Sequence, residues 1–425
     1  MTAVLLRADA GQAIGAGHLM RCLSLARALP ATVEPIVVTS CPVPSLLDRV
    51  RDAGIRLERL EASHPDPTDV PAVAALARRT SASAIVIDGY HFDERYVDAM
   101  NGAGLRTIVI DDAPRLSEYR SAVLVDQNIG ALSQPYRVAS HTRVLLGPRF
   151  TLLAPEYAEV PARVVPACAR RLLVTMGAAD PRDATSLVLR ALRPVGDRFD
   201  VTVVVGAANS RRELVRTLAG ELPAASVVEN ASGLQSLLGA ADMAIAAVGI
   251  TIWEIARYGV PTLLLSGDPV HHRVAQIASR YGAHRWLGSI ADVTDSAIAT
   301  AVADLAEDAS ARREMARLGQ ALIDGRGAHR VATAVCNTTS TATTRPSSDD
   351  DAEPAWEMTA SPESFGPFET RFRRIVRQPS ARAVTLAHDE AVERVVWTDD
   401  QGHRTILVPP ALQSRAIDME RYEYR

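Results

Sequence analysis

Short apolar runs alternate with amphipathic segments over most of this chain. Several of the apolar runs are continuous, which is typical of parallel strands that are covered on both faces. In the first half we predict strands at Pro35 to Thr39, Ala84 to Asp88, Thr107 to Ile110 and Ala122 to Val125, and helices at Val70 to Arg79 and Asp93 to Ala103. This alternation predicts an α/β protein with a doubly wound sheet, which binds ligands at the carboxyl ends of its strands.

A second alternating series follows a proline- and alanine-rich segment, Pro155 to Ala169, which we interpret as an interdomain linker. Its predicted strands are Arg171 to Met176, Val201 to Val205, Ala224 to Val228, Met243 to Ala247 and Thr262 to Leu265. Its predicted helices are Arg212 to Leu222, Leu234 to Leu238, Thr251 to Tyr258 and Val274 to Tyr281. The pattern therefore predicts one domain over residues 1–155 and a similar domain over residues 170–336.

The pattern breaks after residue 336. Residues 337–362 are rich in threonine and serine and carry three consecutive aspartates, a composition typical of a disordered linker. Residues 363–425 predict a small β-containing domain, with a hairpin formed by Glu393 to Trp397 and Thr405 to Val408. One interpretation of this tail is a docking module for a partner protein.

Composition excludes several classes of function. The chain has 425 residues, of which 47% are hydrophobic, enough for two or three domain cores. A net charge of -4 provides no basic surface for nucleic acid or an anionic membrane. The chain contains no lysine, which excludes Schiff-base chemistry on a lysine side chain.

The four cysteines are scattered and form no C-x-x-C pair, which argues against a zinc site and fits reduced thiols. The first apolar run is short and soon carries Arg7 and Asp9, unlike a signal peptide. No apolar run approaches the roughly 20 residues that span a bilayer. We therefore expect a cytoplasmic protein without a membrane span.

The most informative motif lies at the start of the chain, where an apolar strand leads through a glycine turn into a helix. The turn contains Gly15 and Gly17 and ends at His18. Glycines let the backbone approach a ligand closely, and a helix start offers free N–H groups to an anion. His18 adds a group that can transfer protons near neutral pH. The alternative is that His18 is a structural histidine.

Other predicted strands of the first half also end in polar residues. Asp88 and Tyr90 follow one strand and should reach the same cleft as His18, unless they form an ordinary turn. Asp111 and Asp112 follow the next strand, but adjacent side chains at a strand end usually diverge, so we do not favour a metal site.

In the second half, a loop at Ala247 to Thr251 joins a strand to a helix. Gly249 and the N–H groups that follow it, beginning with Ile250, can hold a diphosphate; Thr251 can add a hydroxyl, and Glu254 can accept ribose hydroxyls. The alternative is a helix N-cap with an acidic first turn.

Two further features of the second half bear on this interpretation. The loop from Gly177 to Asp180 lies at another strand end, and two such loops favour nucleotide binding. His271 and His272 are adjacent in a predicted loop, and we expect a ligand contact or a surface position rather than zinc.

Together these motifs resemble the nucleotide-sugar hydrolases of pseudaminic acid biosynthesis, which release UDP from UDP-2,4-diacetamido-2,4,6-trideoxy-β-L-altropyranose. The matching stretches are Arg7 to Asp9, Ile14 to His18 with Arg21, Asp88 to Tyr90, Asp111 to Asp112, Val125 to Asn128, Leu146 to Phe150, Met176 to Asp180, and Gly249 to Thr251 with Trp253 and Glu254. The resemblance covers about Val4 to Val335. It departs at Ala178, where the family usually has a second glycine.

The resemblance implies a GT-B architecture, with two Rossmann-like doubly wound domains that face a cleft, similar to the N-acetylglucosaminyltransferase of peptidoglycan synthesis. It implies His18 and Tyr90 as catalytic residues, and no metal or other cofactor. The substrate-binding residues that it implies are Arg7, Asp9, Gly15, Gly17, Arg21, Asp88 and Asn128, and the nucleotide-binding residues are Gly177, Asp180, Gly249, Ile250, Thr251 and Glu254.

The resulting hypothesis is a UDP-sugar hydrolase in which His18 assists attack of water at the anomeric carbon, with C–O cleavage and inversion. One alternative is a GT-B glycosyltransferase that passes the sugar to an acceptor. Another is a non-enzymatic protein that binds a nucleotide sugar.

Overall fold

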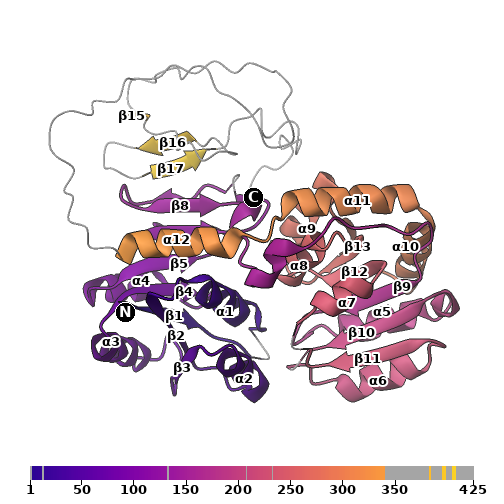
Figure 1. Ribbon diagram of the computed structural model, residues 1–425, viewed down its shortest axis with the longest axis horizontal. Coiled ribbons are helices and arrows are strands. Elements are labelled where there is room, and N and C mark those ends of the chain that lie inside the picture. The colour runs from indigo at the N-terminus through magenta and orange to yellow at the C-terminus, as the bar shows by residue number, and fades with distance from the viewer. Residues whose placement is uncertain are drawn as a thin grey trace.

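The computed structural model describes residues 2–339, apart from 12–13, 132–133, 207 and 232, together with three short strands in the C-terminal tail. These residues form two α/β domains that lie side by side (Figure 1). The predicted fold class and the predicted strands are confirmed to within one or two residues.

The first domain contains a seven-stranded parallel sheet in the order β3-β2-β1-β4-β5-β6-β8. Its strands are β1 Thr2–Ala8, β2 Val33–Thr39, β3 Arg56–Arg59, β4 Ala82–Asp88, β5 Arg106–Ile110, β6 Val123–Asp126 and β8 Arg143–Leu146. Its helices are α1 Gly17–Ala28, α2 Pro44–Asp52, α3 Asp69–Thr80 and α4 Glu94–Gly102. Val4 and Leu6 pack into the core on one face of β1 while Leu5 packs on the other, which explains the continuous apolar run.

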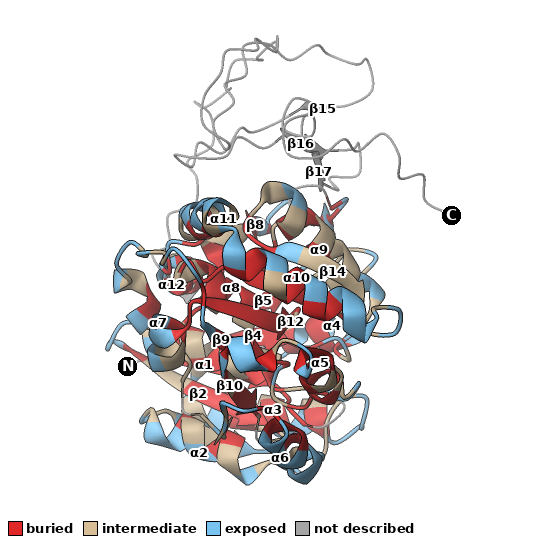
Figure 2. Ribbon diagram, turned by 90° about the vertical axis from the view of Figure 1, so that its right-hand side faces the viewer, coloured by how far each residue is buried: buried red, intermediate tan, exposed pale blue. Residues whose placement is uncertain are grey.

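The second domain repeats this plan with a six-stranded parallel sheet in the order β11-β10-β9-β12-β13-β14. Its strands are β9 Arg171–Thr175, β10 Asp200–Val205, β11 Ala225–Glu229, β12 Met243–Ala247, β13 Thr262–Ser266 and β14 Arg285–Ser289. Its helices are α5 Ala184–Leu192, α6 Arg212–Gly220, α7 Gln235–Ala240, α8 Thr251–Arg257, α9 Pro269–Tyr281, α10 Asp295–Glu307 and α11 Ala309–Leu322. In Figure 2 the central strands of both sheets are buried, and exposed residues gather on the outer helices.

The strand order places the predicted motifs at the switch point of each sheet. In the first sheet the order reverses between β1 and β4. β1 leads into the turn before His18, and β4 ends in Asp88. In the second sheet the order reverses between β9 and β12. β9 precedes Gly177, and β12 precedes Gly249. Open α/β sheets form ligand crevices at such points, so both domains direct these loops toward a binding site.

The last described helix, α12 Gly327–Thr339, returns to the first domain (Figure 1). Its apolar residues, including Val331 and Val335, belong to the same buried cluster as α1 and β1. The segment that we assigned to the end of the second domain therefore completes the core of the first. Residues 337–339, which we placed in a disordered linker, continue this helix.

The proline-rich segment between the domains is held against the second domain by hydrogen bonds. It begins with a 3-10 helix, Pro155–Glu159. Arg257 donates to the carbonyl oxygens of Tyr157 at 2.7 Å and Val160 at 3.0 Å, and Arg312 donates to that of Ala167 at 2.9 Å. The linker is thus anchored rather than loose.

Helix α9 begins five residues earlier than predicted. The Asp268 side chain accepts a hydrogen bond from the His271 backbone N–H at 3.0 Å, and Pro269 occupies the first turn. Both features favour a helix start. His271 and His272 therefore lie in the first turn of a helix, and our loop assignment was wrong.

In the tail, β16 Val395–Thr398 and β17 Arg404–Leu407 pair antiparallel, which confirms the predicted hairpin. β15 Arg382–Ala383 pairs with β16, and β17 pairs with β7 Arg137–Val138 of the first domain. The rest of residues 340–425, including most of the predicted linker and the candidate docking module, lies outside the described residues. Among the helices that the structure describes, none has both the length and the apolar character needed to cross a bilayer.

Candidate active site

A cavity of about 130 Å³ lies between the two domains, at the switch points of both sheets. The first domain contributes His18, Arg21, Tyr90 and Asn128, among others. The second domain contributes mainly apolar and backbone surface from the loop after β12, from α8 and from the start of α9. His18 and Tyr90, which we placed in one cleft from the sequence, thus meet in the structure, together with Gly249 of the second domain.

His18 is the second residue of α1, and its ring is nearly buried. Its Nδ1 lies 2.7 Å from Oδ1 of Asp88 at the end of β4. The same Nδ1 also lies 2.8 Å from Nη2 of Arg21. A proton on Nδ1 is donated to the carboxylate and leaves Nε2 as the acceptor, whereas a proton on Nε2 leaves Nδ1 to accept from the guanidinium. The arrangement is that of a histidine base oriented by a carboxylate.

Gly15 and Gly17 shape the turn that presents this histidine. Gly15 has a φ of +80°, which favours glycine, and its backbone exchanges hydrogen bonds with Gly11 at 2.7 and 3.0 Å. Gly17 lines the cavity, and a Cβ at that position would meet no atom within 4 Å. The start of α1 has no side-chain cap, so its N–H groups are not used by a side chain.

Arg21 lies one turn after His18 and connects two carboxylates. It donates to both oxygens of Asp88, at 2.6 and 2.9 Å, and to both oxygens of Asp112, at 2.8 and 3.0 Å. We predicted Arg21 and Asp88 as substrate-binding residues. Their side chains are buried and bind each other, so their visible role is to fix the histidine.

Asp112 is a residue of this network that our sequence analysis considered only as a metal ligand. Its Oδ2 accepts from the Tyr90 hydroxyl at 2.6 Å, and its Oδ1 accepts from Asn128 at 2.7 Å. Burial opposes its ionisation, but Arg21 and these hydrogen bonds hold the pKa of Asp112 well below its usual range. Asp111 points elsewhere, toward Arg115, so the two aspartates diverge as expected.

Tyr90 combines a half-exposed ring with an engaged hydroxyl. The ring stands edge-on to His18, with centroids 4.8 Å apart. Burial and the charge of Asp112 raise the pKa of Tyr90, which keeps the phenol protonated and able to donate. Among the described residues, no group of three or more His, Cys, Asp or Glu side chains is placed to hold a metal ion.

Asn128 connects Asp112 to a second buried carboxyl, Asp126. Its side chain donates to Asp126 Oδ1 at 3.0 Å, and its backbone N–H donates to the same oxygen at 2.9 Å. Tyr136 donates to the other oxygen at 2.9 Å. Burial and the neighbouring charge of Asp112 raise the pKa of Asp126 to about 8, so this carboxyl is mostly neutral at pH 7.

Arg7 and Asp9 do not face the cavity, contrary to our prediction that they bind substrate. Both are buried, and they form an ion pair at 2.6 Å. Arg7 also pairs with Asp69 of α3 at 2.6 Å, and Asp9 accepts from the Ser40 backbone at 2.7 Å. Their charges are satisfied within the first domain, where they tie β1 to its neighbours.

In the second domain, Gly249 and Ile250 line the cavity. We predicted both residues to contact a nucleotide. A Cβ on Gly249 would meet nothing within 4 Å, so the space before this loop is open. Thr251 and Glu254 are absent from the cavity wall, and burial raises the pKa of Glu254. Thr251 is the first helical residue and no side chain caps α8, but Glu254 lies in its first turn, so the acidic first turn of our alternative is confirmed and its side-chain cap is not.

The loop after β9 serves a structural purpose in addition to any ligand contact. Asp180 is buried, and its carboxylate accepts from the backbone N–H groups of Ala184 and Thr185 at 2.8 and 2.9 Å, where α5 begins. Its acceptor oxygens are thus committed to the helix, which argues against the predicted contact with a nucleotide. Gly177 has a φ of +83°, and the adjacent Ala178 packs against the core of the first domain.

Eight residues of the cavity wall were not in our predicted site: Ile14, Asp112, Gln127, Val248, Trp253, Val270, His271 and Val274. Trp253 lies within the family-like stretch near Glu254, which was the available signal. His271 Nδ1 lies 2.6 Å from Asp268, so its ring is oriented by the residue that also caps α9.

Two curated proteins are similar to the chain in sequence. The spore coat polysaccharide biosynthesis protein SpsG of Bacillus subtilis is 29% identical over 218 residues, which is 50% of this chain and 64% of SpsG. The uncharacterized protein MJ1062 of Methanocaldococcus jannaschii is 19% identical over 268 residues, which is 60% of this chain and 54% of that protein. The chain thus spans less than two thirds of the length of each relative. No family model matches the chain.

Solved structures match over most of the chain. MurG of Acinetobacter baumannii superposes with a TM-score of 0.56 at 12% identity, covering 79% of this chain and 100% of MurG. MnaA of S. aureus, solved with UDP, gives a TM-score of 0.57 at 13% identity and covers 81% and 99%. The chain has the GT-B fold. At these identities the likeness establishes the fold of the chain, and its activity has to be argued from the site.

Proposed function

We propose that this GT-B protein hydrolyses a UDP-linked 2,4-diacetamido-trideoxy sugar to the free sugar and UDP. The observation that carries the proposal is the His18–Asp88 contact at 2.7 Å, which orients the imidazole at a cavity between the two domains. A base in that position can accept a proton from water while the water attacks a bound substrate.

The reaction balances without a cofactor. The water oxygen forms a bond to the anomeric carbon, and the bond from that carbon to the diphosphate oxygen breaks. UDP leaves with the electron pair, and His18 Nε2 takes the proton of the attacking water. Attack on the face opposite the leaving group inverts the anomeric centre.

The leaving group is proposed to lie against the second domain. Gly249 leaves open space before the first N–H groups of the loop after β12, which suits close approach of a diphosphate. No lysine is present, so backbone N–H groups and arginine have to meet the developing charge.

The comparisons support a sugar nucleotide as the ligand. MnaA of S. aureus is solved with UDP, and the Anabaena protein HepE, also a GT-B neighbour by structure, is solved with UDP and glucose. SpsG is named for polysaccharide biosynthesis. These properties belong to those proteins and enter here only as support for the proposal.

The test is release of UDP from UDP-linked 2,4-diacetamido-trideoxy sugars in water enriched with heavy oxygen, with chelator present and no acceptor added. We expect UDP release with the label on the sugar. Label on the nucleotide would mean attack at phosphorus and would refute the mechanism. Turnover only after addition of an acceptor would favour a glycosyltransferase, and tight binding of UDP-sugar without turnover under either condition would favour a binding protein.

A further inference from the structure

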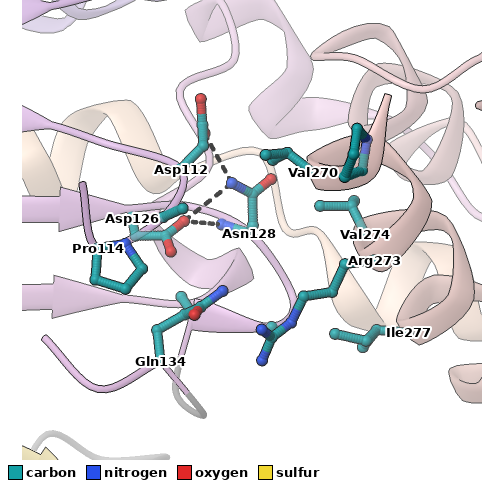
Figure 3. A pocket seen from close by; sticks show the side chains of 13 residues that line it. Asp112, Pro114, Asp126, Asn128, Gln134, Val270, Arg273, Val274 and Ile277 are labelled. Carbon is teal, nitrogen blue, oxygen red and sulfur yellow. Dashed lines mark hydrogen bonds between the residues drawn. The ribbon is translucent and has the colours of Figure 1, made fainter. Parts of the chain in front are cut away.

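A second and larger cavity adjoins the site of His18. It measures about 280 Å³ and lies between the ends of β5 and β6 in the first domain and helix α9 in the second (Figure 3). Asp112, Asn128, Val270 and Val274 line both cavities, so the two share a wall. A sugar placed with its anomeric carbon near His18 can therefore extend a substituent into the second cavity.

We propose that this second cavity is a subsite for an N-acyl group longer than acetyl on the sugar, with the amide held between Asn128 and Gln134 and the acyl chain packed against Ile277. This inference rests on the proposed function, because it assumes that a sugar nucleotide enters the cleft. It keeps the hydrolysis of a UDP-linked diamino-trideoxy sugar but changes the substrate in one respect, because a longer acyl group replaces one of the two acetyl groups.

The polar groups of the cavity match an amide. Asn128 donates its amide hydrogens to Asp112 and Asp126, which leaves its Oδ1 as an acceptor for a ligand N–H (Figure 3). Gln134 is 93% buried and lines the cavity, and its side chain makes no hydrogen bond within the part of the chain that the structure describes. Its polar atoms are not among the fully buried ones that lack a partner, so its amide N–H is accessible to a ligand carbonyl.

The remaining wall suits an apolar chain. Val274 and Ile277 follow each other along α9 at a spacing of three residues and face the cavity from the second domain. Liquid water occupies about 30 Å³ per molecule, so an acetyl group of three heavy atoms would leave most of the space unfilled. Asp126 is mostly neutral at pH 7 and Asp112 is already paired with Arg21, so the carboxyl side of the wall suits an uncharged occupant. Arg273 also lines the wall from α9, and a succinyl donor tests its influence below.

The experiment measures binding and turnover separately. UDP-linked amino sugars that carry acetyl, butanoyl or hexanoyl groups are titrated by calorimetry into the His18→Ala variant of the full chain, and UDP release is measured with the wild type. Each added methylene that is buried should increase affinity about fourfold. We expect the butanoyl donor to bind more tightly than the acetyl donor.

Two cavity variants locate the effect. Ile277→Trp should remove the preference for the longer chains while acetyl binding changes little. Gln134→Leu should weaken all acylated donors about tenfold without altering the chain-length trend, because it removes one hydrogen bond. Arg280→Trp, at an exposed position on the same helix, is the control and should leave the series unchanged.

Each outcome decides the proposal. Affinity that does not depend on chain length, or a loss on Ile277→Trp that is equal for all donors, would overturn it. Tighter binding of a succinyl donor than of the butanoyl donor would also overturn it, because Arg273 on the α9 wall would then be the recognition element. If chain length governs affinity but no donor releases UDP, the subsite stands and the hydrolase proposal fails. If every donor is hydrolysed at the same rate with equal affinity, the subsite proposal fails and the hydrolase proposal stands.

Discussion

The two sides of the cleft differ in kind although both are built on the same type of parallel sheet. The first domain presents charged side chains that bind one another, with His18, Arg21 and Asp112 at its centre. The second domain presents backbone and apolar surface, including Gly249 and Val274. Under the proposed function, the first domain carries proton transfer and orientation, whereas the second holds the ligand by shape and backbone N–H groups.

This comparison has an energetic basis. Buried charges are tolerated only where partners satisfy them, so the first-domain network is rigid and fixes one geometry for His18. An open glycine loop commits no side chain and can adapt to a diphosphate. Substitutions on the two sides should therefore affect different kinetic parameters.

The largest expected effect comes from removing the base. His18→Ala should lower kcat about 10²- to 10⁴-fold, the range typical of general base catalysis, while the affinity for UDP measured by calorimetry stays nearly unchanged. His141→Ala, at an exposed position outside the cleft, is the matched control. Turnover within threefold of the wild type in the His18 variant would show that the first domain does not supply the base.

The next effect should come from the opposite side of the cleft. Gly249→Val adds a side chain where no atom lies within 4 Å, so the fold should tolerate it while the bulk fills the ligand space. We expect UDP affinity to fall about 10- to 100-fold. Gly220→Val, where a Cβ also meets no atom within 4 Å, is the control at the end of α6. If UDP binds normally to the Gly249 variant, the nucleotide lies elsewhere.

A smaller effect should separate the Tyr90 hydroxyl from its ring. Tyr90→Phe removes the hydrogen bond to Asp112 at 2.6 Å but keeps the edge contact with His18. We expect kcat to fall about tenfold, as for one hydrogen bond to a charged group. If the hydroxyl acts only by holding Asp112, the double variant with Asp112→Asn should be no worse than Asp112→Asn alone. Additive losses would instead give the hydroxyl a direct role in the reaction.

The sequence predicted those site residues whose position follows from local pattern. His18 lies in a glycine turn between a strand and a helix, and Asp88 ends a buried strand, so both fall at the carboxyl edge of a parallel sheet. Asp112 follows the neighbouring strand and carried the same signal, but we considered it together with the adjacent Asp111 only for metal binding, which we did not favour, and gave it no other role.

What the sequence could not provide was pairing between distant segments. Arg7 and Asp9 were assigned to the substrate, yet they are satisfied by Asp69 and Ser40, whose proximity depends on how α3 and β2 pack against β1. The return of α12 to the first domain likewise depends on contacts between residues more than 300 positions apart, such as Val331 with the cluster around Val4. Periodicity identifies an apolar helix face but does not identify which core it covers.

The last prediction concerns the stability of the fold and not turnover, and it comes from the carboxyl of the first-domain network that is mostly neutral at pH 7. The pKa of Asp126 is raised by burial and by Asp112 to about 8, above its value in the unfolded chain. Between about pH 4 and pH 8 the folded carboxyl keeps its proton while the unfolded one has lost it, so unfolding releases a proton and is favoured as pH rises. The wild type should therefore lose stability relative to Asp126→Asn across this window, by on the order of a few kcal/mol.

The measurement is the free energy of unfolding in denaturant at several pH values, for the wild type, for Asp126→Asn and for Asp48→Asn as an exposed control. The control should run parallel to the wild type. Parallel curves for Asp126→Asn as well would mean that the carboxyl is ionised throughout, held by the donors Asn128 and Tyr136. Asp126 would then be a further buried negative charge at the larger cavity. This result would remove one argument for an uncharged acyl group in that cavity.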